Sequence, residues 1–201
     1  MSPSQPRKSR FRRIWGWLRS PSRLSLLTLL LIGFFGGIAF WGGFHWSLEM
    51  TNTEKFCTGC HEMRDNVYAE YQGTIHDKNR TGVRATCPDC HVPKVWVYKI
   101  WRKMQASQEV WGHLTGYVDT KEKFESHRME LASHEWARME ASGSRECKNC
   151  HSWEGMEKSK QRPRAQQNHA EAQAAGKSCI DCHKGIAHLL PKEYKGNEEE
   201  E

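Results

Sequence analysis

The sequence predicts a mainly α-helical protein, in which a single N-terminal transmembrane helix is followed by a domain of two similar halves. Three observations support this prediction. An uncharged apolar segment lies near the N-terminus, four copies of one short cysteine motif follow it, and the segment between the second and third copies carries apolar residues at helical spacing. No stretch shows the array of short alternating segments that is typical of strands.

The first 46 residues determine the expected topology. Residues 1–23 contain seven lysine and arginine residues and no acidic residue, whereas residues 24–44 contain no charged residue. At about 1.5 Å per residue the uncharged segment spans about 32 Å, enough to cross a hydrocarbon layer of about 30 Å. The positive-inside rule therefore predicts a basic cytoplasmic arm over residues 1–23 and a transmembrane anchor over residues 24–46. The segment is too long, and its end too bulky, for a cleaved signal peptide.

Each of the four repeated motifs has the form C-x-x-C-H. Their residues are Cys57, Cys60 and His61; Cys87, Cys90 and His91; Cys147, Cys150 and His151; and Cys179, Cys182 and His183. Two thiols at this spacing can bond to the edge of a porphyrin while the adjacent imidazole binds its iron. Zinc hooks and disulfides are the alternatives, but neither requires a histidine after the second cysteine. The motifs predict four covalent c-type haems and a multihaem cytochrome c domain over residues 47–191.

The spacing of the motifs predicts two pseudo-repeated di-haem halves. First cysteines lie 30 residues apart in the first pair of motifs and 32 in the second, and 60 residues separate the pairs. His76 and His169 stand 11 and 10 residues before the second motif of their halves. We expect these two histidines and His188 to be distal iron ligands. His127 stays open as a fourth distal ligand, and three further histidines are expected to have no ligand role, namely His45, His113 and His134.

Met63 follows the first motif by two residues. Its thioether could bind the first iron and raise the reduction potential of that haem, or its side chain could fill a gap in the core. Both alternatives stay open at this point.

Apolar spacing predicts helices over residues 95–114, 121–141 and 161–175, and residues 192–201 form an acidic tail that we expect to be disordered. The chain has a net charge of +6, and the arm alone contributes +7, so the remainder sums to −1. Binding of nucleic acid is therefore not expected.

Covalent haem attachment occurs outside the inner membrane of bacteria, so we expect a single-pass inner-membrane protein with a periplasmic haem domain. Gly33 and Gly37 form a G-x-x-x-G pattern that could support a homodimer within the lipid bilayer.

These features together resemble the NapC/NirT family of membrane-anchored tetrahaem cytochromes, over residues 10–191. The resemblance rests on the arm, the anchor, the four motifs, and the segments 82–93 and 179–188. It implies a quinol dehydrogenase that passes electrons from membrane quinol to a periplasmic reductase. The expected recipient is the periplasmic nitrate reductase, with its catalytic and dihaem subunits as partners.

The resemblance also implies roles for individual residues. In a relative of known structure that serves a nitrite reductase, the methionine corresponding to Met63 ligates the first haem, so His61 and Met63 compete for that role here. A lysine and an acid line the quinol pocket of the family. Lys103 and Glu109 are the nearest matches, with Asp119 as a competing acid.

Quinol oxidation releases two electrons and two protons, so an acceptor haem and a proton-accepting group must lie beside the quinol. The first haem is attached soon after the anchor, Glu109 could accept a proton, and Lys103 could bind the quinol oxygen. Both side chains could instead be exposed charges on an amphipathic helix. The functional alternatives are a terminal reductase of nitrite or hydroxylamine, a donor to another periplasmic reductase, and an anchor that only docks a partner. The expected role is electron transfer rather than that of a stand-alone enzyme.

Overall fold

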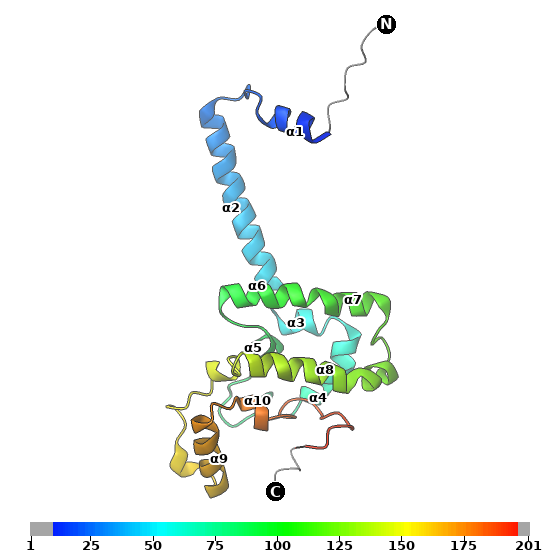
Figure 1. Cartoon of the computed structure of the whole chain (residues 1–201), viewed down its shortest axis with the longest axis vertical. Coiled ribbons are helices and arrows are strands. Elements are labelled where there is room, and N and C mark those ends of the chain that lie inside the picture. Colours follow the sequence, from blue (N-terminus) through cyan, green and yellow to red (C-terminus); the bar gives the residue numbers. More distant parts are fainter. Residues whose placement is uncertain (1–9, 197–201) are drawn as a thin grey trace. The chain divides into compact units, whose positions relative to one another are not determined.

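The computed structural model describes residues 10–196, which form helices and no strand (Figure 1). The chain divides after Leu48 into two compact units. The helices in chain order are α1 (Arg10–Leu18), α2 (Leu26–Met50), α3 (Glu54–Cys57), the π-helix η1 (Met63–Tyr68), α4 (Ala69–Tyr71), α5 (Cys87–His91), α6 (Trp96–Gln105), α7 (Ser107–Thr115), α8 (Lys121–Ala141), the 3-10 helices η2 (Cys147–Asn149) and η3 (Lys158–Lys160), α9 (Pro163–Ala174) and α10 (Cys179–Cys182). The prediction of a mainly α-helical chain with one N-terminal apolar helix is confirmed.

The helix α2 is the one described helix that is long and apolar enough to cross a membrane. It has 25 residues, and its most apolar part has a mean hydropathy of 1.9. At about 1.5 Å per residue the helix is about 38 Å long. It begins where the hydroxyl of Ser25 accepts the backbone N–H of Thr28 at 3.2 Å, so the start lies two residues after the predicted one. It also continues four residues past the predicted end at residue 46.

The helix α1 was not predicted. It lies within the segment expected to be a basic arm, of which residues 1–9 fall outside the described residues. Phe11, Ile14, Trp15 and Leu18 recur at helical spacing among the arginines, and all four side chains are exposed. The abundance of arginine hid this apolar periodicity in the sequence.

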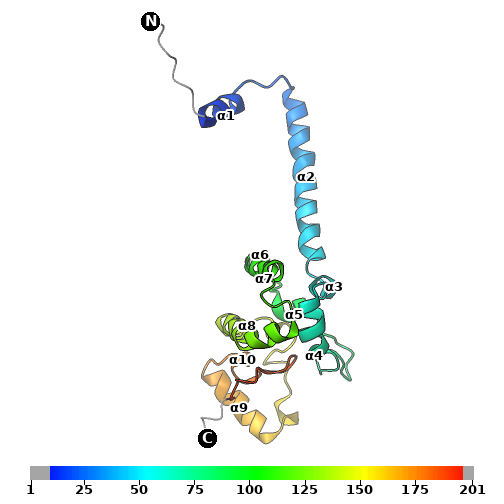
Figure 2. The same ribbon diagram turned by 90° about the vertical axis from the view of Figure 1, so that its right-hand side faces the viewer.

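The helix predicted over residues 95–114 is divided into α6 and α7 at Ala106. The Ser107 hydroxyl donates to the carbonyl of Met104 at 2.7 Å, and the N–H of Glu109 bonds to the carbonyl of Ala106 at 3.1 Å, three residues back. A hydroxyl that bonds to the backbone competes with the regular helical pattern. The two helices nevertheless follow nearly one line (Figures 1 and 2).

The helix α8 has the predicted bounds. The hydroxyl of Thr120 accepts the N–H of Lys123 at its start, and Gly143 takes a positive φ of 63° just after its end. The helix α9 starts at Pro163, two residues later than predicted, because proline is favoured in the first turn. Residues 192–196 of the predicted acidic tail form a turn region, and residues 197–201 fall outside the described residues.

The apolar core of the second unit is small and includes the contact between α8 and α10. Phe124 and Met139 of α8 and Ile180 of α10 are buried. The hydroxyl of Ser144, which has no exposed surface, accepts the backbone N–H of Ile180 at 3.1 Å. This bond ties the end of α8 to the fourth cysteine motif.

Candidate haem-attachment sites

The second motif of each half is formed on a single helical turn. In α5 the backbone N–H of Thr86 donates to Asp89 at 2.8 Å, and in α10 that of Ser178 donates to Asp181 at 2.7 Å. Each bond belongs to a capping box. Residues three and four apart share a face of a helix, so both thiols of each motif project to one side. In α5 the imidazole of His91 lies on the same face, whereas His183 directly follows the end of α10.

The first cysteines of neighbouring motifs lie in contact. A hydrogen bond with the Cys87 thiol lowers the pKa of Cys57 to about 7 and raises the pKa of Cys87. In the second half, burial raises the pKa of Cys147, and the neighbouring thiol of Cys179 raises it further. All eight cysteines are free thiols in the structure.

The second and third motifs are also neighbours. Burial raises the pKa of Cys90 to about 11, and the charges of Cys147 and Cys150 add to this increase. The four motifs therefore follow one another in space in the order in which they occur in the chain.

Every motif histidine has the ring of another histidine about 6 Å away, with enough space between the two rings for one iron. The ring centroids are separated by 6.1 Å for His61 and His113, 6.2 Å for His91 and His188, 6.2 Å for His151 and His76, and 6.0 Å for His183 and His169. A metal–imidazole bond of about 2 Å on each side places two axial rings about 6 Å apart. The residues of all four sites thus fit a haem iron between two imidazoles.

Hydrogen bonds hold several of these rings by the nitrogen Nδ1. Nδ1 of His91 lies 2.7 Å from Oε1 of Glu135, that of His188 lies 3.0 Å from the carbonyl oxygen of Val67, and that of His169 lies 2.8 Å from Oε1 of Gln161. An imidazole that donates from Nδ1 presents Nε2 to a metal, and the acceptor fixes the ring orientation.

Glu135 is the charged member of this group of acceptors. Burial raises the pKa of its carboxyl, but the charges and hydrogen bonds of His91 and Arg138 outweigh burial and hold that pKa well below its usual range. The carboxylate therefore stays ionised beside the imidazole of His91.

The remaining candidates for iron ligands lie elsewhere. Met63 begins η1, and its side chain is 40% exposed. The ring of His127 stacks on Tyr117 with centroids 4.0 Å apart and bonds to its hydroxyl at 2.9 Å. His45 packs against Trp41 within α2, and His134 is exposed on α8.

The three candidates for the quinol pocket have different surroundings. Nζ of Lys103 is 2.9 Å from both the carbonyl and the hydroxyl oxygen of Thr51, and burial lowers its pKa. Glu109 pairs with Arg102 at 2.7 Å and is exposed. The charge of Lys103 lowers the pKa of the Cys57 thiol and that of Glu109 raises it, so both residues lie near the first motif.

Asp119 is the competing acid. It pairs with Lys123 at 2.7 Å, and the hydrogen bond from this lysine lowers its pKa. A smaller contribution comes from His61, so Asp119 also lies within electrostatic range of the first motif.

Sequence reasoning did not identify Glu62, His113 and Glu135 as site residues. Glu62 is 5% exposed and lies 2.6 Å from Nδ1 of His113. The one signal in the sequence was the position of Glu62 directly after a motif histidine, and nothing linked it to a residue 51 positions away.

Paired thiols, adjacent imidazoles and a second imidazole at each site define a multihaem c-type cytochrome. Residues 19–193 match the NapC/NirT cytochrome c family, N-terminal region. The chain belongs to this family, and it carries covalently bound c-type haem.

Three relatives illustrate the similarity. Cytochrome c-type protein NapC of Escherichia coli (strain K12) is 53% identical over 191 residues, which cover 95% of this chain and 96% of the relative. Denitrification system component NirT of Stutzerimonas stutzeri is 59% identical over 87% of this chain and 88% of its own length. Cytochrome c-type protein NapC of Paracoccus pantotrophus is 56% identical over 92% of this chain and 81% of its own length. No solved structure matches the chain.

Proposed function

We propose that this protein is a membrane-anchored quinol dehydrogenase that delivers electrons, through four c-type haems, to the periplasmic nitrate reductase. The observation that carries this proposal is the set of four motif histidines, each with a second imidazole about 6 Å away. The similarity to proteins named NapC supports the choice of recipient. The similarity to a denitrification component supports another periplasmic reductase as the alternative recipient.

For three of the haems, the ring pairs support a specific assignment of ligands. His91 and His188 hold the haem of the second motif, His151 and His76 that of the third, and His183 and His169 that of the fourth. When bound, the haems supply one-electron carriers between quinol and reductase. The capping boxes shared by α5 and α10 support the two pseudo-repeated halves.

The topology in this proposal is N-terminus in the cytoplasm and haem domain in the periplasm, with α2 in the inner membrane. The basic segment before α2 supports this orientation through the positive-inside rule. The first haem is attached at Cys57, seven residues after the last residue of α2, so it is the haem nearest to the membrane along the chain.

Lys103 is the proposed contact of this chain with the quinol oxygen. Its half-buried ammonium donates to Thr51, near the first motif, and burial lowers its pKa. A partly desolvated ammonium is a strong hydrogen-bond donor to an oxygen that gains negative charge as its proton leaves.

Oxidation of quinol to quinone releases two protons that must reach solvent. Of the two candidate acids, Glu109 is the proposed acceptor. Its carboxylate is exposed and close enough to influence Cys57, whereas the hydrogen bond from Lys123 lowers the pKa of Asp119 and makes it a weaker base.

The experiment uses the full-length holoprotein in detergent and measures haem reduction by a water-soluble quinol analogue in a stopped-flow spectrometer. We expect Lys103→Leu to slow reduction at least tenfold, while dithionite still reduces all haems. Lys99→Leu is the matched control, because Lys99 lies one turn earlier in α6 and pairs with Glu49 instead. Equal rates for the native protein and Lys103→Leu would refute the role of Lys103. Rapid reoxidation by nitrite, with no reduction by quinol, would favour a terminal reductase.

A further inference from the structure

The histidine pair at the first motif includes a residue without an assigned role. His113 of α7 lies with its ring centroid 6.1 Å from that of His61, with the two rings inclined at 65°. The other three pairs have separations of 6.0 to 6.2 Å and join a motif histidine to an expected distal ligand. We propose that His113 is the second axial ligand of the haem attached at Cys57 and Cys60. This inference rests on the proposed presence of a haem at the first motif.

The hydrogen bond of His113 favours iron ligation. Its Nδ1 lies 2.6 Å from Oε1 of Glu62, as Nδ1 of His91 lies 2.7 Å from Oε1 of Glu135. A carboxylate that accepts from Nδ1 fixes the tautomer in which Nε2 can bind a metal and makes that nitrogen a stronger ligand. Two of the four sites therefore have the same carboxylate–imidazole arrangement.

The surroundings of Glu62 explain why this carboxylate holds the ring. Its side chain is 5% exposed, and its second oxygen, Oε2, is buried without a hydrogen-bond partner among the described residues. A buried carboxylate needs a positively polarised partner, and the N–H of His113 is that partner.

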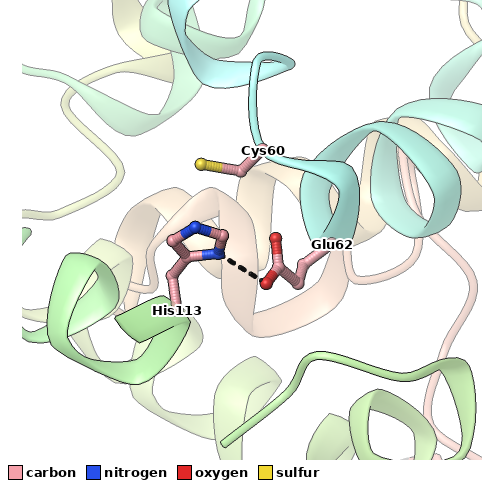
Figure 3. A group of neighbouring side chains, drawn as sticks. All are labelled: Cys60, Glu62 and His113. Carbon is pink, nitrogen blue, oxygen red and sulfur yellow. Dashed lines mark hydrogen bonds and ion pairs between the residues drawn. The ribbon is translucent and has the colours of Figure 1, made fainter. Parts of the chain in front are cut away.

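A separate small-metal site is the competing explanation for these side chains. The thiol of Cys60 and the polar atoms of Glu62 and His113 lie within 4.8 Å of one another, and Figure 3 shows the sulfur and the imidazole directed into the same space. The Cys60 thiol, however, is the second attachment point of a C-x-x-C-H motif. Once the thioether bond forms, the thiolate that a separate metal ion would need is consumed. The cluster is then part of the first haem site.

Met63 is the competing ligand within the chain. It lies two residues after His61 and would replace that histidine rather than His113. The two assignments differ in spectroscopy, because an iron with two imidazoles and an iron with a thioether ligand have different near-infrared magnetic circular dichroism.

The test compares the oxidised full-length holoprotein with His113→Met, His113→Ala and Met63→Leu, and uses His134→Ala as a matched control on the exposed face of α8. We expect the native spectrum to contain no thioether band. The spectra of Met63→Leu and His134→Ala should be the same as the native spectrum. His113→Met should gain a thioether band from one haem in four. His113→Ala should gain a high-spin signal from one haem, which added imidazole converts back to low-spin.

One result would overturn the inference, namely entirely low-spin haems in His113→Ala together with no new band in His113→Met. A native thioether band that disappears in Met63→Leu contradicts the pairing of His113 with His61, because Met63 would then hold the position of His61. The number of haems per chain, measured as the pyridine complex, distinguishes failure of the two proposals. Fewer than four haems in the native protein would contradict the proposed function. Four haems with unchanged spectra in both His113 variants contradict only the ligand assignment.

Discussion

Arg128 provides the sharpest test of how the second unit is held together. Its side chain in α8 is only 8% exposed, and its guanidinium donates to both oxygens of Glu70 and both oxygens of Glu125. It also donates to the carbonyl of Leu189 at 3.2 Å, and Glu70 in turn accepts the N–H of Leu189 at 2.9 Å. One arginine therefore joins α4, α8 and the residue that follows His188.

Replacement of Arg128 by methionine keeps much of the apolar stem but leaves two carboxylates without their cation. Removing one partner of a buried ion pair costs about 3–5 kcal/mol. The side chain of Glu125 is 32% exposed, so water compensates part of its loss, whereas that of Glu70 is only 13% exposed. We therefore expect the lower end, about 3 kcal/mol, which corresponds to a fall in melting temperature of about 6–12 °C for a chain of this size.

The assay is urea unfolding of the holoprotein, followed by far-ultraviolet circular dichroism and by haem absorbance. Arg64→Met is the matched control, because the Arg64–Asp65 pair is exposed, at 55% and 60% of the two side chains. An exposed pair contributes about 1 kcal/mol or less. Equal losses of stability in Arg128→Met and Arg64→Met would refute the reasoning that burial makes this ion pair important.

Three further predictions concern pH, a glycine and the haem environment. The hydrogen bond from Arg128 lowers the pKa of Glu125. The ionised carboxylate therefore stabilises the fold above its unfolded pKa of about 4.3, and this stabilisation is lost as the pH falls. The difference in the free energy of unfolding between the native protein and Arg128→Met should accordingly narrow in urea titrations from pH 7 to pH 3. Gly116→Ala should cost about 1–2 kcal/mol in the same titration, because Gly116 has a φ of 68° and a Cβ there would lie 2.8 Å from Oδ2 of Asp119. Glu135→Gln should raise the reduction potential of one haem by about 59 mV, because the imidazole of His91 loses a charged hydrogen-bond acceptor. This shift is equivalent to a tenfold change in the affinity of that imidazole for ferric relative to ferrous iron. An unchanged potential in spectroelectrochemical titrations would contradict the prediction.

Local signals in the sequence predicted local structure well. The bounds of α8 could be predicted because Thr120 and Gly143 mark its ends with side-chain capping and a positive φ. The break at Ala106 could not be predicted, since alanine favours a helix and the interruption depends on the Ser107 hydroxyl and its bond to Met104.

Contacts between distant parts of the chain were beyond local patterns. The motifs identified the cysteines and the adjacent histidines because their chemistry is contained in five consecutive residues. The proximity of His113 to His61 depends on how α7 packs, and no repeat marks it. His113 lies on a segment whose apolar spacing indicated only a helix, which is why no ligand role was expected for it.

The partners of the histidine rings cross between the two halves. His76 belongs to the first half and lies beside His151 of the second, while His188 of the second half lies beside His91 of the first. On the proposed ligation, neither half expressed alone could complete both of its own iron sites. The haem of the second motif also depends on a ligand 97 residues further along the chain. On the proposed topology, its coordination is therefore completed only after almost the whole domain has crossed the membrane.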